Sequence, residues 1–193
     1  MKIFKENSYD IVRLYVNQLG IMIFSMLLYI AIGSFENTDF FSGLSIFVSL
    51  FSVCFYFVLI YYIMWELGAK DKIRIDGGRA EPCKSKGFVM GLFANIPNFV
   101  LGILSTLFLT IALLTGNAAI NRIFFIFNLF MRFHASMYMG IITESIPSSL
   151  SSEFLIEAIL FTVLPAISIV ITHIAYQLGS KEKKLFSFLT SKK

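Results

Sequence analysis

Four long apolar stretches, separated by short polar segments, restrict what this sequence can fold into. They cover residues 14–33, 41–65, 88–114 and 154–178. A helix rises about 1.5 Å per residue, so about 20 apolar residues cross the hydrocarbon core of a bilayer. Hydrophobic residues make up 57% of the chain and charged residues only 15%, a composition unlike that of a water-soluble domain. We therefore predict an all-α polytopic membrane protein with four transmembrane helices in a single membrane domain, residues 1–193.

The first apolar stretch begins with the features of a secretory signal, because Lys2, Lys5 and Arg13 precede it. A signal peptide, however, has a shorter apolar core and a small-residue cleavage site after it. Residues 14–33 are too long for such a core, and no A-x-A pattern follows them. We predict an uncleaved helix.

The distribution of basic residues predicts the orientation of the chain. If both termini and the 66–87 segment are cytoplasmic, every Lys and Arg except Arg122 and Arg132 lies on that side. The positive-inside rule favours this arrangement. We therefore expect a multi-pass protein of the cytoplasmic (inner) cell membrane with both termini inside. The bases lie beside apolar spans, so the net charge of +4 does not indicate binding to nucleic acid.

Residues 120–142 are apolar overall but carry a narrow polar arc. At about 100° per residue, Asn121, Asn128 and Arg132 fall on one side of a helix. We predict an amphipathic helix in the outer interface, with its Phe, Ile and Met side chains towards the acyl chains. A membrane-spanning helix is the open alternative. It is disfavoured because a fifth span would send the basic C-terminal tail outside.

A short motif occurs twice and indicates an internal duplication. Residues 65–72 read WELGAKDK and residues 176–183 read YQLGSKEK, with Leu, Gly and both Lys identical. Residues 14–17 (LYVN) align in the same way with residues 92–95 (LFAN). We predict two copies of a two-helix hairpin, arranged as a parallel repeat. Repeat 1 covers 1–72, a cytoplasmic loop 73–87, repeat 2 covers 88–183 with an inserted segment 116–153, and a basic cytoplasmic tail covers 184–193.

Two roles are open for the repeated motif. In the first, each glycine adopts a left-handed conformation that closes a helix, while the lysines complement the negative helix end and contact lipid phosphate. In the second, the two copies form paired docking surfaces for a membrane or cytosolic protein partner, which would also explain the shared Leu and acid. The residues concerned are Leu67, Gly68, Lys70, Lys72, Leu178, Gly179, Lys181 and Lys183.

The segment after the first motif copy alternates polar and apolar residues. This pattern covers residues 72–76 and meets Gly77 and Gly78. Alternation followed by D-G-G predicts either a small β-hairpin on the membrane surface or an ordinary loop.

Polar residues inside the apolar stretches have two interpretations. Small and polar side chains allow close helix packing in lipid, so they could form a packing seam. They could instead line a polar path, with the asparagines in the cytoplasmic half and the charged residues at the outer mouth. The candidate path residues are Asn17, Asn95, Asn98, Glu157 and Arg132. Pro97, between two of these asparagines, predicts a kink or a break in its helix.

No catalytic or metal-binding pattern is present. Cys54 and Cys83 form no CxxC motif, and His134 and His173 lie on different segments. We expect no enzyme activity, no cofactor and no bound metal. The predicted function is that of a transport-related or accessory membrane component. The alternative is a non-transporting anchor or adaptor that recruits a partner through the paired motifs.

Overall fold

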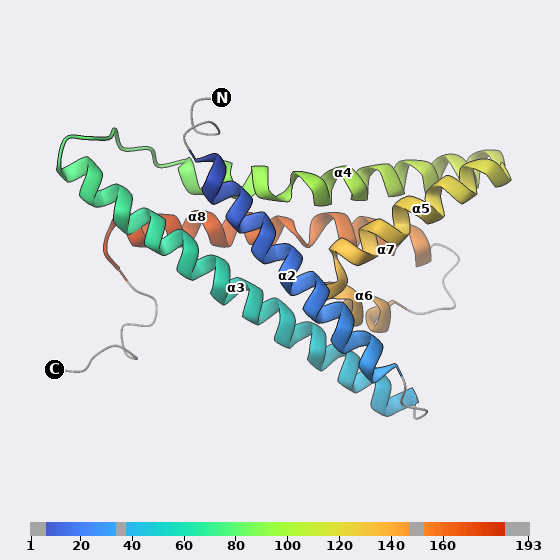
Figure 1. Cartoon of the computed structure of the whole chain (residues 1–193). Helices are drawn as coiled ribbons and strands as arrows, with labels where there is room; N and C mark the ends of the chain where they lie inside the picture. Colours follow the sequence, from blue (N-terminus) through green and yellow to red (C-terminus); the bar gives the residue numbers. More distant parts are fainter. Residues whose placement is uncertain (1–6, 34–37, 147–152, 184–193) are drawn as a thin grey trace. The chain divides into compact units, whose positions relative to one another are not determined.

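A computed structural model describes residues 7–33, 38–146 and 153–183 (Figure 1). Every regular element in these ranges is a helix. The helices are α2 (Ser8–Ile32), α3 (Thr38–Asp76), α4 (Lys86–Thr115), α5 (Ala118–His134), the 3-10 helix η1 (Ser136–Tyr138), α6 (Met139–Ser145), α7 (Glu153–Val163) and α8 (Ala166–Ser180). The predicted tail 184–193 lies outside the described residues.

Four helical stretches are long and apolar enough to cross a membrane. They are Ser8–Ile32, Ser42–Asp76, Lys86–Thr115 and Phe154–Ser180, the last of which contains both α7 and α8. The prediction of four such helices is therefore confirmed by their length and composition. α5 and residues Ser136–Ser145 meet at a bend of 76°. The number of spans would rise to five only if these two bent segments together formed a single span.

The outward faces of these helices carry large apolar side chains. On α3, Ser45, Ser49 and Ser52 are at most 1% exposed, whereas Phe47 and Leu50 are 62% and 51% exposed. The other long helices also have exposed large apolar side chains. A water-soluble protein buries such side chains, whereas a bilayer solvates them. This arrangement suits an integral membrane protein.

The chain divides into two compact units. Unit 1 comprises the described residues of 1–15, 57–94 and 167–193, and unit 2 comprises the described residues of 16–56 and 95–166. Each unit is considered separately below.

The end of α3 differs from the prediction. The helix continues to Asp76, so the hairpin expected from residues 72–76 is wrong. The alternation instead places Lys72 one turn before Asp76, and the two form an ion pair of 2.7 Å. Gly78 closes the helix with φ +69°, while the N–H of Arg79 donates to Arg74 O at 2.8 Å. The D-G-G sequence is therefore a helix cap.

The two prolines within the long apolar helices, Pro97 and Pro165, have different effects on the backbone. A kink or a break was predicted at Pro97; α4 continues through it as one helix, so a break is wrong and a kink stays a prediction. A proline removes a single backbone donor, and a long helix can continue past it. The last span is interrupted instead, at Leu164 and Pro165 between α7 and α8.

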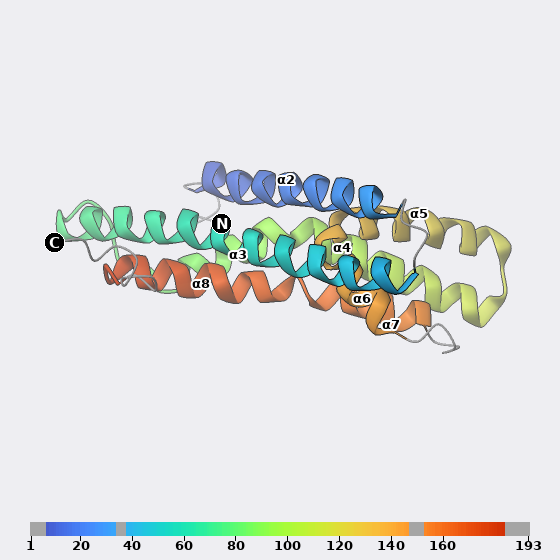
Figure 2. The same ribbon diagram turned by 90° about the horizontal axis from the view of Figure 1, so that it is seen from below.

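The amphipathic segment is shorter than predicted. The helix α5 ends at His134, so a continuous helix over 120–142 is wrong. Figures 1 and 2 show α5 leaving the end of α4 and lying beside its C-terminal part. The rings of Phe108 and Phe127 stack there, with centroids 5.3 Å apart. Asn128, in the predicted polar arc, is buried within the protein, while Phe125 and Phe130 are exposed. Whether the segment lies in the interface stays a prediction.

Candidate functional site

The bend between α5 and α6, which contains the 3-10 helix η1, is deeply buried in unit 2. Ala135, Ser136, Met137 and Tyr138 are each at most 3% exposed. The hydroxyl of Ser136 donates to the carbonyl of Met22 at 2.7 Å, and the hydroxyl of Ser25 donates to the carbonyl of Ser136 at 3.2 Å. These reciprocal bonds attach the bend to α2.

The following residues attach the bent segment to α3. The N–H of Gly140 donates to the hydroxyl of Ser49 at 2.8 Å. A Cβ atom at Gly140 would collide with the backbone carbonyl of Ser45, so only glycine permits this approach. The stripe of serines on α3 therefore faces the bend, where it supplies a hydrogen-bond acceptor.

A buried charge pair joins α5 to α7. The guanidinium of Arg132 donates to the carboxylate of Glu157, which is 3% exposed. Arg132 also donates from Nε to the Oδ1 of Asn128 at 2.9 Å, and its guanidinium lies 6.0 Å from the ring centroid of Phe161. The two predicted charged path residues are thus direct partners, and Asn128 belongs with them.

The predicted asparagines of α4 form a second buried polar group. Nδ2 of Asn98 donates to Oδ1 of Asn95 at 3.1 Å, and both side chains are buried. The helical continuation through Pro97 keeps these two residues on one face. Asn17 is only half-buried, whereas its neighbour Gln18 is 1% exposed. The role predicted for Asn17 stays a prediction, and Gln18 is the fully buried polar residue on this turn of α2.

Several buried polar atoms have no hydrogen-bond partner among the described residues. All but one of them, Nδ1 of His173, belong to unit 2. They are both amide atoms of Gln18, the hydroxyls of Ser52, Ser105 and Tyr138, Oδ1 of Asn98 and Nδ2 of Asn128. The sequence gave no reason to select Gln18 or Tyr138, because a single polar residue in an apolar helix does not reveal which way it faces.

The two motif copies meet in unit 1. A Cβ at Gly68 would collide with the backbone of Tyr176, and a Cβ at Gly179 would collide with the backbone of Trp65. Both glycines lie within helices, and neither has a positive φ. The prediction that they close helices in a left-handed conformation is therefore wrong. They instead permit close contact between α3 and α8, whose C-terminal parts lie side by side in Figures 1 and 2.

The aromatic residue of each copy donates a hydrogen bond to the end of the other copy. The indole N–H of Trp65 donates to the carbonyl of Lys183 at 2.7 Å, and the hydroxyl of Tyr176 donates to Asp71 at 2.9 Å. Asp71 is buried and also binds the ammonium of Lys86 at 2.5 Å. The acid of the first copy is therefore used inside the protein.

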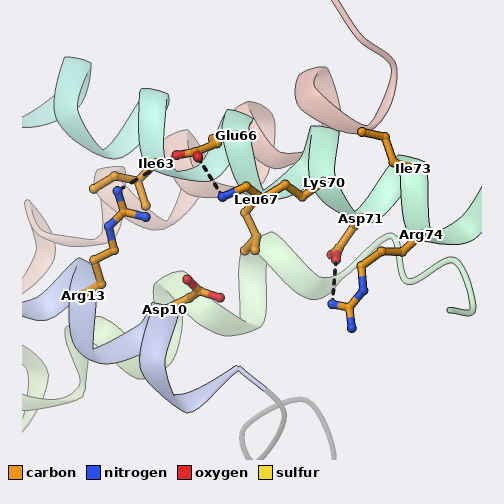
Figure 3. Close-up of a pocket in the computed structure, with 9 residues that line it drawn as sticks. All are labelled: Asp10, Arg13, Ile63, Glu66, Leu67, Lys70, Asp71, Ile73 and Arg74. Atoms are coloured by element: carbon orange, nitrogen blue, oxygen red, sulfur yellow. Dashed lines mark ion pairs between the residues drawn. The ribbon is translucent and has the colours of Figure 1, made fainter. Parts of the chain in front are cut away.

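The remaining motif residues line two open cavities of unit 1. Leu67 and Lys70 face a cavity of about 400 Å³ between α2 and α3, where Lys70 pairs with Glu66 and Arg13 approaches the same carboxylate (Figure 3). Lys72 and Lys181 line the second cavity, of about 370 Å³. The backbone carbonyl of Lys183 accepts the Trp65 bond, and Leu178 is half-buried.

Within the described ranges, no group of three or more His, Cys, Asp or Glu could hold a metal ion. Cys54 and Cys83 are both free thiols. The comparisons with known proteins found no matching family model, no matching curated protein and no matching solved structure.

Proposed function

We propose that this chain is an integral protein of the cell membrane that gives a small polar solute or an ion a path through unit 2, without catalytic chemistry. One observation carries the proposal: buried polar atoms on α2, α3, α4, α5 and η1 have no partner among the described residues. In hydrocarbon, each such atom is costly because no water can reach it. Water or a polar solute inside unit 2 would supply the missing partners.

A packing seam explains these residues less well. In membranes, an interhelical hydrogen bond contributes on average only about 0.6 kcal/mol. Leaving a buried polar group unpaired costs about 1–3 kcal/mol, which is more than such a bond returns. Gln18 has two unpaired atoms, so a purely structural role would favour an apolar residue at this position.

The charge pair and the bent segment support the same proposal. Ionisable residues within membrane helices commonly mark ion or solute pathways. An irregular backbone at membrane depth is tolerated where it is buried in protein or lines a cavity, as in the broken helices of transporters. Arg132, near the bend, is bound to Glu157 on α7. In this proposal the pair closes the path, and its separation releases the bent segment.

The orientation and the duplication are parts of this proposal that rest on the sequence. The basic residues favour cytoplasmic termini, and the reciprocal contacts of Gly68 and Gly179 are those expected of a parallel repeat. A reporter enzyme fused after Lys193 should report the cytoplasm, and one inserted between Glu36 and Asp39 should report the outside. Identical readouts would rule out this topology.

The alternative function, a membrane adaptor that recruits a protein partner, is favoured by a different observation. Leu67 and Lys70 line an open cavity that combines apolar and charged side chains (Figure 3). This alternative predicts that Leu67→Ser combined with Lys70→Gln abolishes function in cells and leaves the permeability of reconstituted vesicles unchanged.

The proposed path is tested by cysteine accessibility in a Cys54→Ser, Cys83→Ser background. Ser105→Cys is buried on α4, while Ile103→Cys lies on the same helix with 57% of its surface exposed. A small charged methanethiosulfonate reacts with thiolates, which form in water and not in hydrocarbon. We expect Ser105→Cys, and likewise Ser52→Cys, to react, and Ile103→Cys to stay unmodified.

The outcome decides between a path and a seam. If Ser105→Cys and Ser52→Cys are as inert as Ile103→Cys, unit 2 is dry and the proposal fails. If they react, vesicles containing the protein are tested for faster entry of glycerol, urea and potassium chloride than protein-free vesicles. Modification of Ser105→Cys should then block that entry.

A further inference from the structure

The second cavity of unit 1 collects lysines from three separate segments. Lys72 comes from the end of α3, Lys84 from the connection to α4, and Lys181 from the residue after α8. The cavity has a volume of about 370 Å³, which is within the range of small-ligand sites. We call it the lysine cavity.

The charge of the lysine cavity is only partly balanced. Asp76 is the single carboxylate in its lining, and it is bound to Lys72 at 2.7 Å. Lys84 and Lys181 are exposed and form no ion pair with any described residue. Two ammonium groups are therefore left to attract an anion.

Neutralisation of helix ends does not account for all three lysines. The C-terminal ends of α3 and α8 carry partial negative charge, which Lys72 and Lys181 complement. Lys84 belongs to neither helix, yet it lines the same cavity. The amide of Gln177 approaches the carbonyl of Lys84 at 3.5 Å and so connects this segment with α8. The third lysine thus exceeds what the helix ends require.

We propose that the lysine cavity binds a phosphate group, carried by an anionic lipid headgroup or by a free phosphorylated solute. Lysine binds phosphate as a flexible point charge, and basic pockets between membrane helices on the cytoplasmic side hold anionic headgroups. The apolar side chains of Ile75 and Pro82, also in the lining, suit the glycerol or organic part of such a ligand. This site is separate from the proposed path, and its occupancy does not depend on transport.

The test compares two double variants with equal charge loss in the purified full-length protein. Lys84→Gln with Lys181→Gln removes the two unpaired charges, whereas Lys70→Gln with Arg79→Gln removes two bases outside the cavity lining. The probes are cardiolipin, with phosphatidylcholine as its control, and inorganic pyrophosphate, with chloride as its control. Binding is followed by the shift of the unfolding midpoint.

We expect cardiolipin or pyrophosphate to raise the unfolding midpoint of the wild type. The Lys84/Lys181 variant should bind at least about tenfold more weakly, because each lysine near an anionic surface contributes about 1 kcal/mol. The Lys70/Arg79 variant should bind normally, and Lys84→Arg with Lys181→Arg should retain binding. A response to cardiolipin alone identifies a lipid site, and a response to pyrophosphate identifies a site for soluble phosphates. No response to either, or equal losses in both double variants, would overturn the proposal.

Discussion

Unit 1 surrounds its buried acid with donors, whereas unit 2 leaves buried amides and hydroxyls without partners. In unit 1, Asp71 receives the hydroxyl of Tyr176 and the ammonium of Lys86. In unit 2, both amide atoms of Gln18 and the hydroxyl of Tyr138 are buried and unbonded within the described residues. A fully bonded polar network fixes one arrangement, while an incomplete one needs water or a ligand.

Closely packed glycines are common to both units. Gly68 and Gly179 each leave no room for a Cβ because a backbone segment of the facing helix occupies that space. Such contact between two helices resists sliding and rotation. Gly140 of unit 2 is fitted just as closely against the backbone of Ser45, so the difference between the units lies in how their buried polar groups are bonded and not in glycine packing.

The largest expected effect concerns the charge pair of unit 2. Arg132→Ala should lower the free energy of unfolding by about 3–5 kcal/mol, because it leaves the buried carboxylate of Glu157 uncompensated. Arg132→Leu with Glu157→Leu should recover most of this loss, since both charges are removed together. Chemical denaturation in detergent measures each value.

The matched control for that measurement is Arg122→Ala. Arg122 is an exposed base on the same helix, and its removal should change stability by no more than about 0.5 kcal/mol. Equal effects of Arg122→Ala and Arg132→Ala would contradict a buried ion pair between Arg132 and Glu157.

A second prediction makes similar polar-to-apolar changes in the two units. Tyr176→Phe removes the bond to Asp71 and should destabilise the protein by about 1.5–3 kcal/mol, the range for bonds to charged groups. Gln18→Leu removes an unbonded amide and should stabilise it by about 1 kcal/mol if unit 2 is dry in detergent. Unfolding midpoints provide the comparison.

The sign for Gln18→Leu also tests the proposed path. A stabilised variant that retains permeability would indicate that Gln18 only carries a packing cost. Loss of permeability with unchanged or increased stability is the result expected if Gln18 lines the path. Destabilisation by both Tyr176→Phe and Gln18→Leu would mean that the amide of Gln18 has a polar partner, as the hydroxyl of Tyr176 does.

The sequence predicted the helices better than their contacts. Long apolar runs have few solutions in a bilayer, so the four spans followed from length alone. The periodicity of the sequence also identified the polar arc of α5, but it did not show what that arc faces. An arc that contains Asn128 can face water or a polar protein interior, and only the position of Glu157 on another helix decides between them.

The motif shows a different limit of sequence reasoning. Glycine followed by lysine fits a helix end, and the same pattern fits a close helix crossing in lipid. The choice depends on whether another backbone lies within reach, which is a long-range property. The repetition of the motif was the useful feature, because the two glycines turn out to pack against the opposite copies.

A third prediction concerns that crossing. Gly179→Ala should lower the free energy of unfolding by about 1–3 kcal/mol, because the added methyl group forces α3 and α8 apart. Gly20→Ala is the control, since nothing lies near its Cβ position, and it should raise stability by about 0.5–1 kcal/mol through helix propensity. If Gly179→Ala behaves like Gly20→Ala, the backbones of α3 and α8 are not in close contact at this position.

The smallest expected effect concerns the two helix ends of unit 1. Both α3 and α8 are closed by a residue in the left-handed conformation, which is Gly78 in the first case and Glu182, with φ 55°, in the second. In each case the backbone N–H groups of the three residues that follow the helix donate hydrogen bonds to carbonyls of its last turn. Only the second end carries a side chain in a conformation that disfavours one.

Glu182→Gly should therefore raise the free energy of unfolding. A non-glycine residue in this conformation costs about 1–2 kcal/mol, and the greater freedom of glycine in the unfolded chain offsets part of that gain. A net gain of about 0.5–1 kcal/mol remains. Glu182→Gln separates conformation from charge, because it removes the carboxylate and keeps the strained backbone, so its stability should match the wild type. If Glu182→Gln is stabilising to the same degree as Glu182→Gly, charge repulsion is the cause. The end of α8 would then be unstrained, and unit 1 would contain no local exception to its closely fitted packing.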